Sequence, residues 1–164
     1  MKYLKLETYE EAIQKINDSV SFNLKKENVS LIDSLNRVLA EDISSTIDVP
    51  HFPKSQMDGY AVRSEDTFNA RESAPVKLRI VEKIDAGSSP KHPIESGSCS
   101  YVATGAPVPS GADSVVMIEN ARLEDDSIVI TRGLAPGENV MKKGFDIKKG
   151  SPVLSKNTII TPRI

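Results

Sequence analysis

The positions of glycine and proline constrain the fold of this chain more than any other feature of its sequence. All nine glycines lie at or after Gly59, and all ten prolines lie at or after Pro50, in a chain of 164 residues. Both residue types mark turns and interrupt helices. The first third of the chain is therefore predicted to be helical, and the remainder to consist of short strands joined by turns.

Two apolar patterns predict helices in the N-terminal third. Thr8 and Glu11 have the spacing of a capping box, and apolar residues then recur every three or four positions. This pattern predicts a helix over residues 8–20 with one buried face. A second helix is predicted over residues 31–39, with Ser30 as its N-cap.

Four segments after residue 44 favour β-strands: 76–84, 98–104, 114–118 and 127–131. The first alternates apolar and polar residues, as a half-buried strand does. Asp125 and Asp126 are predicted to form the tip of a hairpin before the last strand. Turn signals about every ten residues predict a small all-β module, barrel-like or sandwich-like. The fold class is therefore predicted to be α+β.

Composition excludes several functional classes. A formal net charge of -2 gives no basic footprint for nucleic acid. The single cysteine, Cys99, cannot form an intramolecular disulfide and is predicted to be a small buried side chain. The N-terminus lacks the apolar run of a signal peptide, and no segment is apolar enough to span a bilayer. We therefore expect a cytoplasmic protein with no membrane partner.

Asp58 is the first candidate site residue. It forms a turn pair with Gly59, after a segment held extended by Pro50 and Pro53 and before an apolar strand that starts at Tyr60. An Asp on such a turn is well placed to face a ligand. The alternative is a hairpin corner with a solvated carboxylate, and the local residues leave both interpretations open.

Two further loops carry candidate groups. In residues 104–113, small residues would let a ligand approach the backbone, and successive amides could form an anion-binding concavity beside the Thr104 hydroxyl. The alternative is an ordinary proline-stiffened connection. Asp146 lies in the second loop, after Lys142 and Lys143, lysines that a solvated strand edge also explains. If folding brought Asp58 and Asp146 together, the two carboxylates could hold Mg²⁺.

Five motifs in order resemble the N-terminal region of the molybdopterin molybdotransferases, the MoeA-type enzymes that include the E domain of gephyrin. They are residues 33–42, 55–63, 86–87, 104–109, and 137–140 with 144–147. Gln56 and Phe145 depart from the family pattern, in which a small and an acidic residue are more usual.

The resemblance implies a division into domains. Residues 1–44 with 140–164 would form an elongated α/β scaffold and dimerisation domain, and residues 45–139 an inserted β domain. Family members continue with a pterin-binding α/β domain and a C-terminal β domain, which are absent from this sequence.

The resemblance also implies a reaction: insertion of molybdate into adenylylated molybdopterin with release of AMP, in a homodimer whose cleft lies between subunits. The molybdopterin adenylyltransferase would be a further partner. By their match to the family motifs, Asp58, Thr104 and Asp146 are the expected catalytic residues, with Asp58 and Asp146 as ligands of Mg²⁺. The expected substrate-binding residues are Ser55, Met57, Gly59, Tyr60, Gly105, Ala106 and Pro107.

Because half of the composite site would be missing, the 164-residue chain alone is predicted to be inactive. Two alternatives stay open. The chain could be a non-catalytic dimerisation or scaffold module that contributes one wall of a composite site. It could also be an unrelated β module for a small anion.

Overall fold

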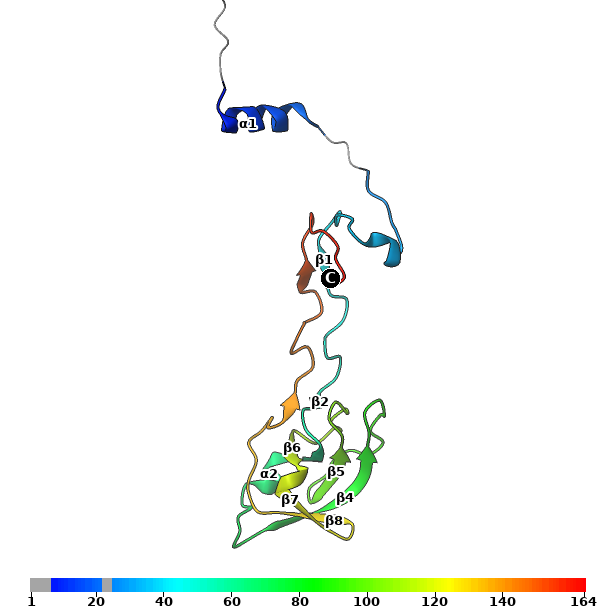
Figure 1. Ribbon diagram of the computed structural model, residues 1–164. Helices are drawn as coiled ribbons and strands as arrows, with labels where there is room; N and C mark the ends of the chain where they lie inside the picture. The colour runs from blue at the N-terminus through cyan, green and yellow to red at the C-terminus, as the bar shows by residue number, and fades with distance from the viewer. Residues whose placement is uncertain (1–6, 22–24) are drawn as a thin grey trace, which may run out of the picture. The chain divides into compact units, whose positions relative to one another are not determined.

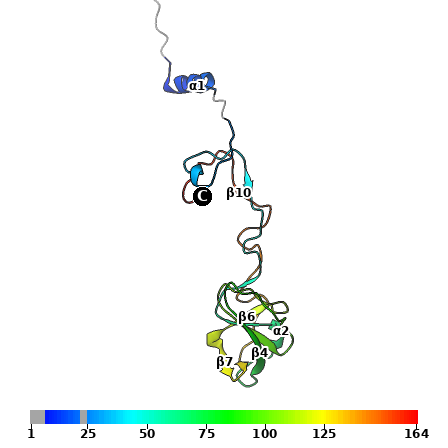
Figure 2. The same cartoon turned by 90° about the vertical axis from the view of Figure 1, so that its right-hand side faces the viewer.

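The computed structural model describes residues 7–21 and 25–164, which form two compact units. One contains the described residues up to 41 together with 155–164, and the other residues 42–154. Figures 1 and 2 show their elements in two views. Two short strand pairs join early and late segments of the second unit. These pairs are β1 (Ile43–Ser44) with β10 (Pro152–Leu154), and β2 (Lys54–Ser55) with β9 (Val140–Met141).

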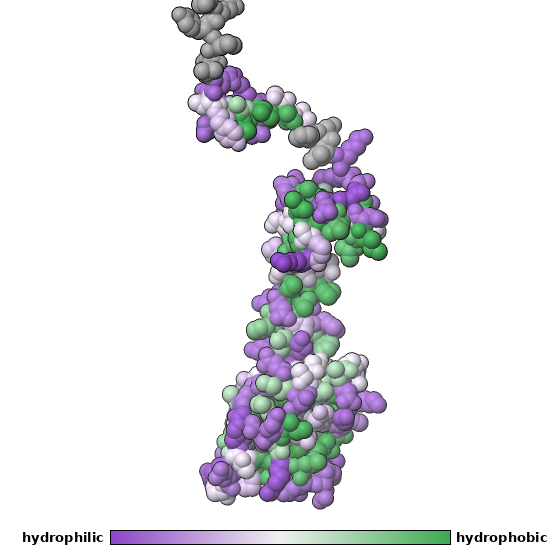
Figure 3. All heavy atoms as spheres, in the orientation of Figure 1, coloured by the Kyte–Doolittle hydropathy of each residue, from purple (hydrophilic) through white to green (hydrophobic). Residues whose placement is uncertain are grey.

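In the first unit, the predicted N-terminal helix is confirmed as α1 (Tyr9–Ser19). Its capping box is also confirmed: the Glu11 amide donates to Thr8 Oγ1 at 3.2 Å, and the Thr8 amide donates to Glu11 Oε2 at 2.9 Å. The prediction that one face would be buried is wrong for this chain, because α1 has no buried residue. Its apolar side chains are visible at the surface (Figure 3).

The predicted second helix is wrong. Only a single 3₁₀ turn, η1 (Ile32–Ser34), forms within residues 31–39. Asn36 has a left-handed φ of 63°, which a helix does not tolerate. The backbone then pairs with the C-terminal segment, because the Asn36 amide donates to Ile160 O at 2.9 Å and the Leu39 amide to Thr158 O at 2.8 Å. This pairing replaces the hydrogen bonds that a helix would have made.

The second unit is built on a curled six-stranded sheet of order β6-β3-β5-β4-β8-β7 (Figure 1). The strands are β3 (Gly59–Val62), β4 (Val76–Ile84), β5 (Ser98–Val102), β6 (Ser114–Met117), β7 (Ala121–Glu124) and β8 (Ser127–Ile130). All neighbours are antiparallel except β4 and β5. Two short helices, α2 (Ser64–Thr67) and η2 (Ile118–Asn120), join strands.

The four predicted strands are therefore confirmed, and β7 is an additional one. The predicted hairpin tip also forms, with Asp125 at a φ of 52°. The described chain is mostly strand with few helices, so its helical content is lower than the α+β prediction implied. None of the described helices is long and apolar enough to cross a membrane.

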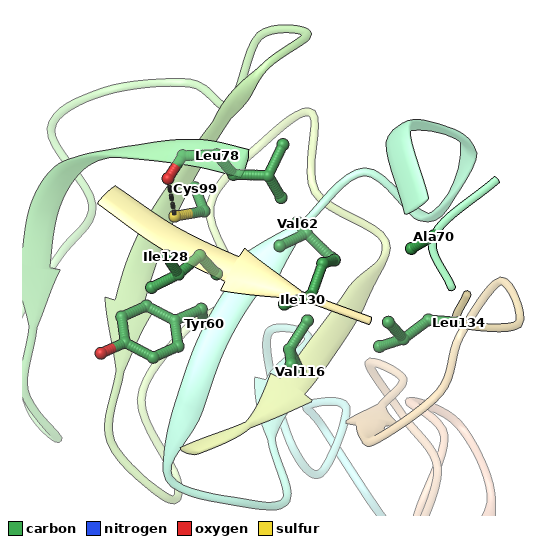
Figure 4. Packing of buried hydrophobic residues seen from close by; sticks show 9 residues of the cluster. All are labelled: Tyr60, Val62, Ala70, Leu78, Cys99, Val116, Ile128, Ile130 and Leu134. Atoms are coloured by element: carbon green, nitrogen blue, oxygen red, sulfur yellow. Dashed lines mark hydrogen bonds between the residues drawn. The ribbon is translucent and has the colours of Figure 1, made fainter. Parts of the chain in front are cut away.

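The core lies on the two faces of this sheet, because successive strand residues point to opposite sides. Tyr60 and Val62 belong to one cluster, and Ala61, between them, belongs to the other. Cys99 is fully buried in the first cluster, as predicted, and its Sγ lies 3.8 Å from Leu78 O (Figure 4). Burial raises the pKa of the Cys99 thiol to about 12.

Candidate functional site

Asp58 and Thr104 meet beyond the strand ends on one side of the six-stranded sheet, before β3 and after β5. The Thr104 amide donates to Asp58 Oδ1 at 2.6 Å, and the Thr104 hydroxyl donates to the same oxygen at 2.9 Å. Both residues are exposed to solvent. The two candidates, 46 positions apart in the sequence, therefore form one polar site.

The strand register explains why they meet. Gly59, the first residue of β3, pairs antiparallel with Val102, the last residue of β5. The turn before β3 and the loop after β5 consequently lie at the same end of this strand pair. The backbone of the turn is also tied to the chain beyond β6, because the Ile118 amide donates to Asp58 O at 3.0 Å.

Ser55 and Gly59 hold the Asp58 turn from either side. The Ser55 hydroxyl donates to Met57 O at 2.5 Å, and the side chain is only 1% exposed. A Cβ atom at Gly59 would lie 2.0 Å from Val116 O, so only glycine fits between β3 and β6. Together these contacts give the Asp58 side chain a defined position.

The Asp58 carboxylate is held in its charged form. Its pKa lies below the ordinary value because of the hydrogen bond from the Thr104 amide, and secondly because of the Thr104 hydroxyl. Both bonds go to Oδ1; within residues 7–21 and 25–164, none is made to Oδ2. Asp58 therefore presents one open anionic oxygen, which suits a cation or a hydrogen-bond donor on a substrate.

The expectation of an anion-binding concavity in the 104–113 loop is wrong for the amides that begin it. The Thr104 amide is used by Asp58. The Gly105 amide donates to Ser55 O, and the Ala106 amide donates to Ala103 O, both at 2.9 Å. The Asp58 carboxylate takes the Thr104 amide and backbone carbonyls take the other two, so none of the three is left for a foreign anion.

The structure separates the predicted substrate-binding residues into two groups. Ser55, Gly59, Tyr60 and Ala106 are buried. Tyr60 packs edge-to-face on Tyr101, with ring centroids 5.8 Å apart, so its position supports a packing role. Met57 is exposed, and Gly105 and Pro107 are half-buried, which leaves these three accessible to a ligand.

Asp146 lies in a different loop, between β9 and β10. Its amide donates to Val49 O at 2.9 Å, and its side chain is exposed. It borders a hollow of about 370 Å³ that is also lined by Phe145 and Lys148. No hydrogen bond joins Asp146 to Asp58 or Thr104 in the part of the chain that the structure describes.

Asp48, which the sequence analysis did not single out, holds the Asp146 loop. Its Oδ1 accepts the Lys149 amide at 2.9 Å, and its Oδ2 lies 3.5 Å from Lys143 Nζ. The Lys149 amide is the main reason why the pKa of Asp48 is lowered. Because the contact spans 101 positions, no local pattern could have indicated it.

A metal site with three or more protein ligands is absent from the described residues, which contain no such group of His, Cys, Asp and Glu. A cation shared by two carboxylates and substrate oxygens would need fewer protein ligands. Asp58 Oδ2 accepts no hydrogen bond from a described residue and the Asp146 side chain is exposed, so each carboxylate has an oxygen that is accessible to a cation.

Comparison with known proteins gives consistent matches. A family model described as the MoeA N-terminal region (domain I and II) matches residues 7–164. A molybdopterin molybdenumtransferase from Staphylococcus aureus is 38% identical over 152 residues, 93% of this chain and 36% of the relative. One from a Nostoc species is 42% identical over 132 residues, 80% of this chain and 30% of the relative. The chain thus spans about a third of these relatives.

The fold matches as well as the sequence. A crystal structure of the molybdopterin biosynthesis MoeA protein from Pyrococcus horikoshii OT3 superposes with a TM-score of 0.91 at 42% identity. The match covers 97% of this chain and 42% of that protein.

Proposed function

Because the chain belongs to the family of MoeA N-terminal regions (domains I and II), we propose that it acts in molybdenum cofactor biosynthesis, as part of a molybdopterin molybdenumtransferase. The match over residues 7–164 is the observation that carries this proposal. The polar pair of Asp58 and Thr104 supports it, because both family motifs contribute to one exposed site.

In the proposed reaction the two dithiolene thiols of adenylylated molybdopterin bind molybdate: two S–Mo bonds form, and one oxo ligand leaves as water with the two thiol protons. AMP is released by hydrolysis. Water attacks a phosphorus atom of the phosphoanhydride; a new P–O bond forms, the bond to the AMP oxygen breaks, and a proton is released. Mg²⁺ bound at this site would supply charge neutralisation for the phosphate oxygens. Asp58 Oδ2 and the Asp146 carboxylate are its proposed ligands.

Thr104 is proposed to position Asp58 as well as to bind the substrate. Its amide and its hydroxyl both donate to Oδ1, so the carboxylate cannot rotate without losing two hydrogen bonds. Oδ2 is thereby left for a ligand. Thr104 Oγ1 still has lone pairs that can accept a hydrogen bond from a substrate group.

A homodimer is proposed for the full-length protein. The first unit leaves large apolar side chains exposed, including Leu31 at 84% and Ile32 at 89%. Exposed apolar surface of this kind marks association sites. In that assembly other domains would complete the cleft, so the 164-residue chain should not turn over adenylylated molybdopterin by itself.

The test is AMP release by the full-length protein that carries this region. We expect Asp58→Asn to reduce AMP release by about 100-fold, because the open anionic oxygen is lost. Asp125→Asn is the matched control: it makes the same change of charge on an exposed turn whose left-handed φ of 52° asparagine accepts. Normal turnover by Asp58→Asn, with a normal circular dichroism spectrum, would contradict the assigned role.

A non-catalytic scaffold is the second candidate function, favoured by the exposed apolar residues of the first unit. AMP release by the isolated chain would contradict both this alternative and the predicted inactivity. The third alternative, a β module for a small anion, loses support because the Thr104, Gly105 and Ala106 amides all donate hydrogen bonds to acceptors within the chain.

A further inference from the structure

The outer side of β7 is an open sheet edge. β7 is the last strand in the order of the six-stranded sheet, and no other described strand pairs with its outer side. The opposite edge is different, because the Val115 amide of β6 donates to Glu138 O at 3.0 Å and the Asn139 side chain donates to Val115 O at 2.9 Å. Open edges are sites where another strand can add.

The turn between β7 and β8 determines which backbone groups face outward. Glu124 and Ser127 flank a two-residue turn, and the first and fourth residues of such a turn are the hydrogen-bonded pair. Hydrogen-bonded and non-hydrogen-bonded pairs alternate along an antiparallel ladder. Leu123, one position before Glu124, therefore directs its N–H and C=O away from β8, toward the open edge.

The side chains of β7 have a self-complementary order. Leu123 is 60% exposed, and the side chains of Arg122 and Glu124, on either side of it, are 73% and 37% exposed. Within one chain Arg122 Nη2 lies 2.7 Å from Glu124 Oε1. Charges on an edge strand usually oppose the addition of another strand, but a positive and a negative charge placed symmetrically about a leucine favour an antiparallel copy.

We propose that β7 is an interaction surface for a second copy of this chain, with the two β7 strands paired antiparallel about Leu123. Leu123 would exchange both backbone hydrogen bonds with the partner's Leu123. Arg122 would face Glu124 of the partner subunit, and Glu124 would face the partner's Arg122. The arrangement is two-fold symmetric, so this interface by itself joins two chains. Together with the homodimer proposed through the first unit, it would link dimers into larger assemblies.

The proposed pairing is independent of the enzymatic proposal. It uses residues 121–124 of the second unit, whereas the exposed apolar residues that support the proposed homodimer belong to the first unit. Opposite charges that face each other across neighbouring strands stabilise the pair, and like charges destabilise it. We expect a weak, concentration-dependent association, because the strand is short.

Disulfide trapping tests the register directly. In the proposed pair the Cα atoms of the two Leu123 residues would be about 5.5 Å apart, a separation that a disulfide bridges. The two Ala121 residues would lie about 14 Å apart along the strands, too far for a bond. The buried Cys99 thiol supplies little background, which the unmodified chain measures.

We expect oxidised Leu123→Cys to give about tenfold more covalent dimer than Ala121→Cys on a non-reducing gel. Equal trapping of the two variants, or no trapping of Leu123→Cys above the unmodified chain, would overturn the proposal.

Charge reversal provides a second test, measured by sedimentation equilibrium. Arg122→Glu places like charges opposite each other twice, so the dissociation constant of the β7-dependent association should rise about tenfold. The double variant with Glu124→Arg as well should restore part of the affinity, because opposite charges face each other again across the strands, while the Lys77–Glu124 ion pair within each chain is lost. If the double variant associated as weakly as Arg122→Glu alone, the pairing would be contradicted. Local destabilisation of β7 by the substitutions would then be sufficient to explain both dissociation constants.

Discussion

The substitution Gly59→Ala should destabilise the second unit, because the space beside Gly59 is filled by backbone. The added Cβ would lie 2.0 Å from Val116 O and 2.9 Å from Val116 C. An ordinary contact is about 3.5 Å or longer. The two strands would therefore have to separate by more than about 1 Å, which breaks a ladder that aligns four residue pairs between β3 and β6.

Overpacking of a well-packed core costs about 1–3 kcal/mol and occasionally more. The atom in the way belongs to the backbone and cannot adopt another rotamer, so we expect a loss of about 3 kcal/mol or more in the free energy of unfolding. Urea denaturation followed by near-ultraviolet circular dichroism of the packed pair Tyr60 and Tyr101 would measure it. The thermal midpoint should fall by roughly 10 °C or more.

Gly97→Ala is the matched control. Gly97 has a φ of 77°, and no atom lies within 4 Å of the place that an added Cβ would take, so this variant reports the cost of the left-handed backbone without a clash. That cost is about 1–2 kcal/mol. If Gly59→Ala lost no more stability than Gly97→Ala, the close approach of β3 and β6 would not be what requires glycine.

Three further outcomes are expected. Thr104→Val removes the hydroxyl but keeps the amide, so the pKa of Asp58, followed by carboxyl NMR, should rise only part of the way to its ordinary value; a full return would contradict the leading role of the amide. The pKa of the Cys99 thiol is near 9 in the unfolded chain and about 12 in the folded chain. The free energy of unfolding should therefore fall as the pH rises from 9 to 12, by up to about 1.4 kcal/mol per pH unit. Urea titrations of Cys99→Ala should lack this loss. Glu82 accepts the Lys91 and His92 amides at 3.0–3.1 Å, so Glu82→Ala should speed amide exchange in residues 86–97, and unchanged exchange would exclude this anchoring.

Local patterns predicted much of this fold. The capping box over Thr8 and Glu11 started α1 where expected. Alternating apolar residues located four strands of the sheet, and an Asp pair located the β7–β8 turn. Ordered motifs indicated the family that the family model matches over residues 7–164. These features depend on residues close together in the sequence, which is why they can be read from it.

The predictions that failed concern contacts between distant segments. Residues 31–39 carry an apolar helical pattern, yet residues 36–39 pair with residues 158–160. The apolar face of α1 was predicted to be buried, but residue spacing shows only that a face is apolar, not what covers it. The amides after Thr104 lie in a loop whose sequence is typical of an anion site, but they already donate hydrogen bonds to carbonyl oxygens of the chain.

The candidate site shows the same division. The sequence by itself determined that Asp58 stands on a turn beside a glycine and that Thr104 begins a loop of small residues. Only the tertiary structure decided that the Thr104 amide and hydroxyl both donate to one oxygen of Asp58. The register of β3 on β5 brings these residues together although they are 46 positions apart in the sequence. Strand pairing between distant segments depends on the packing of the whole sheet, and no local pattern specifies it.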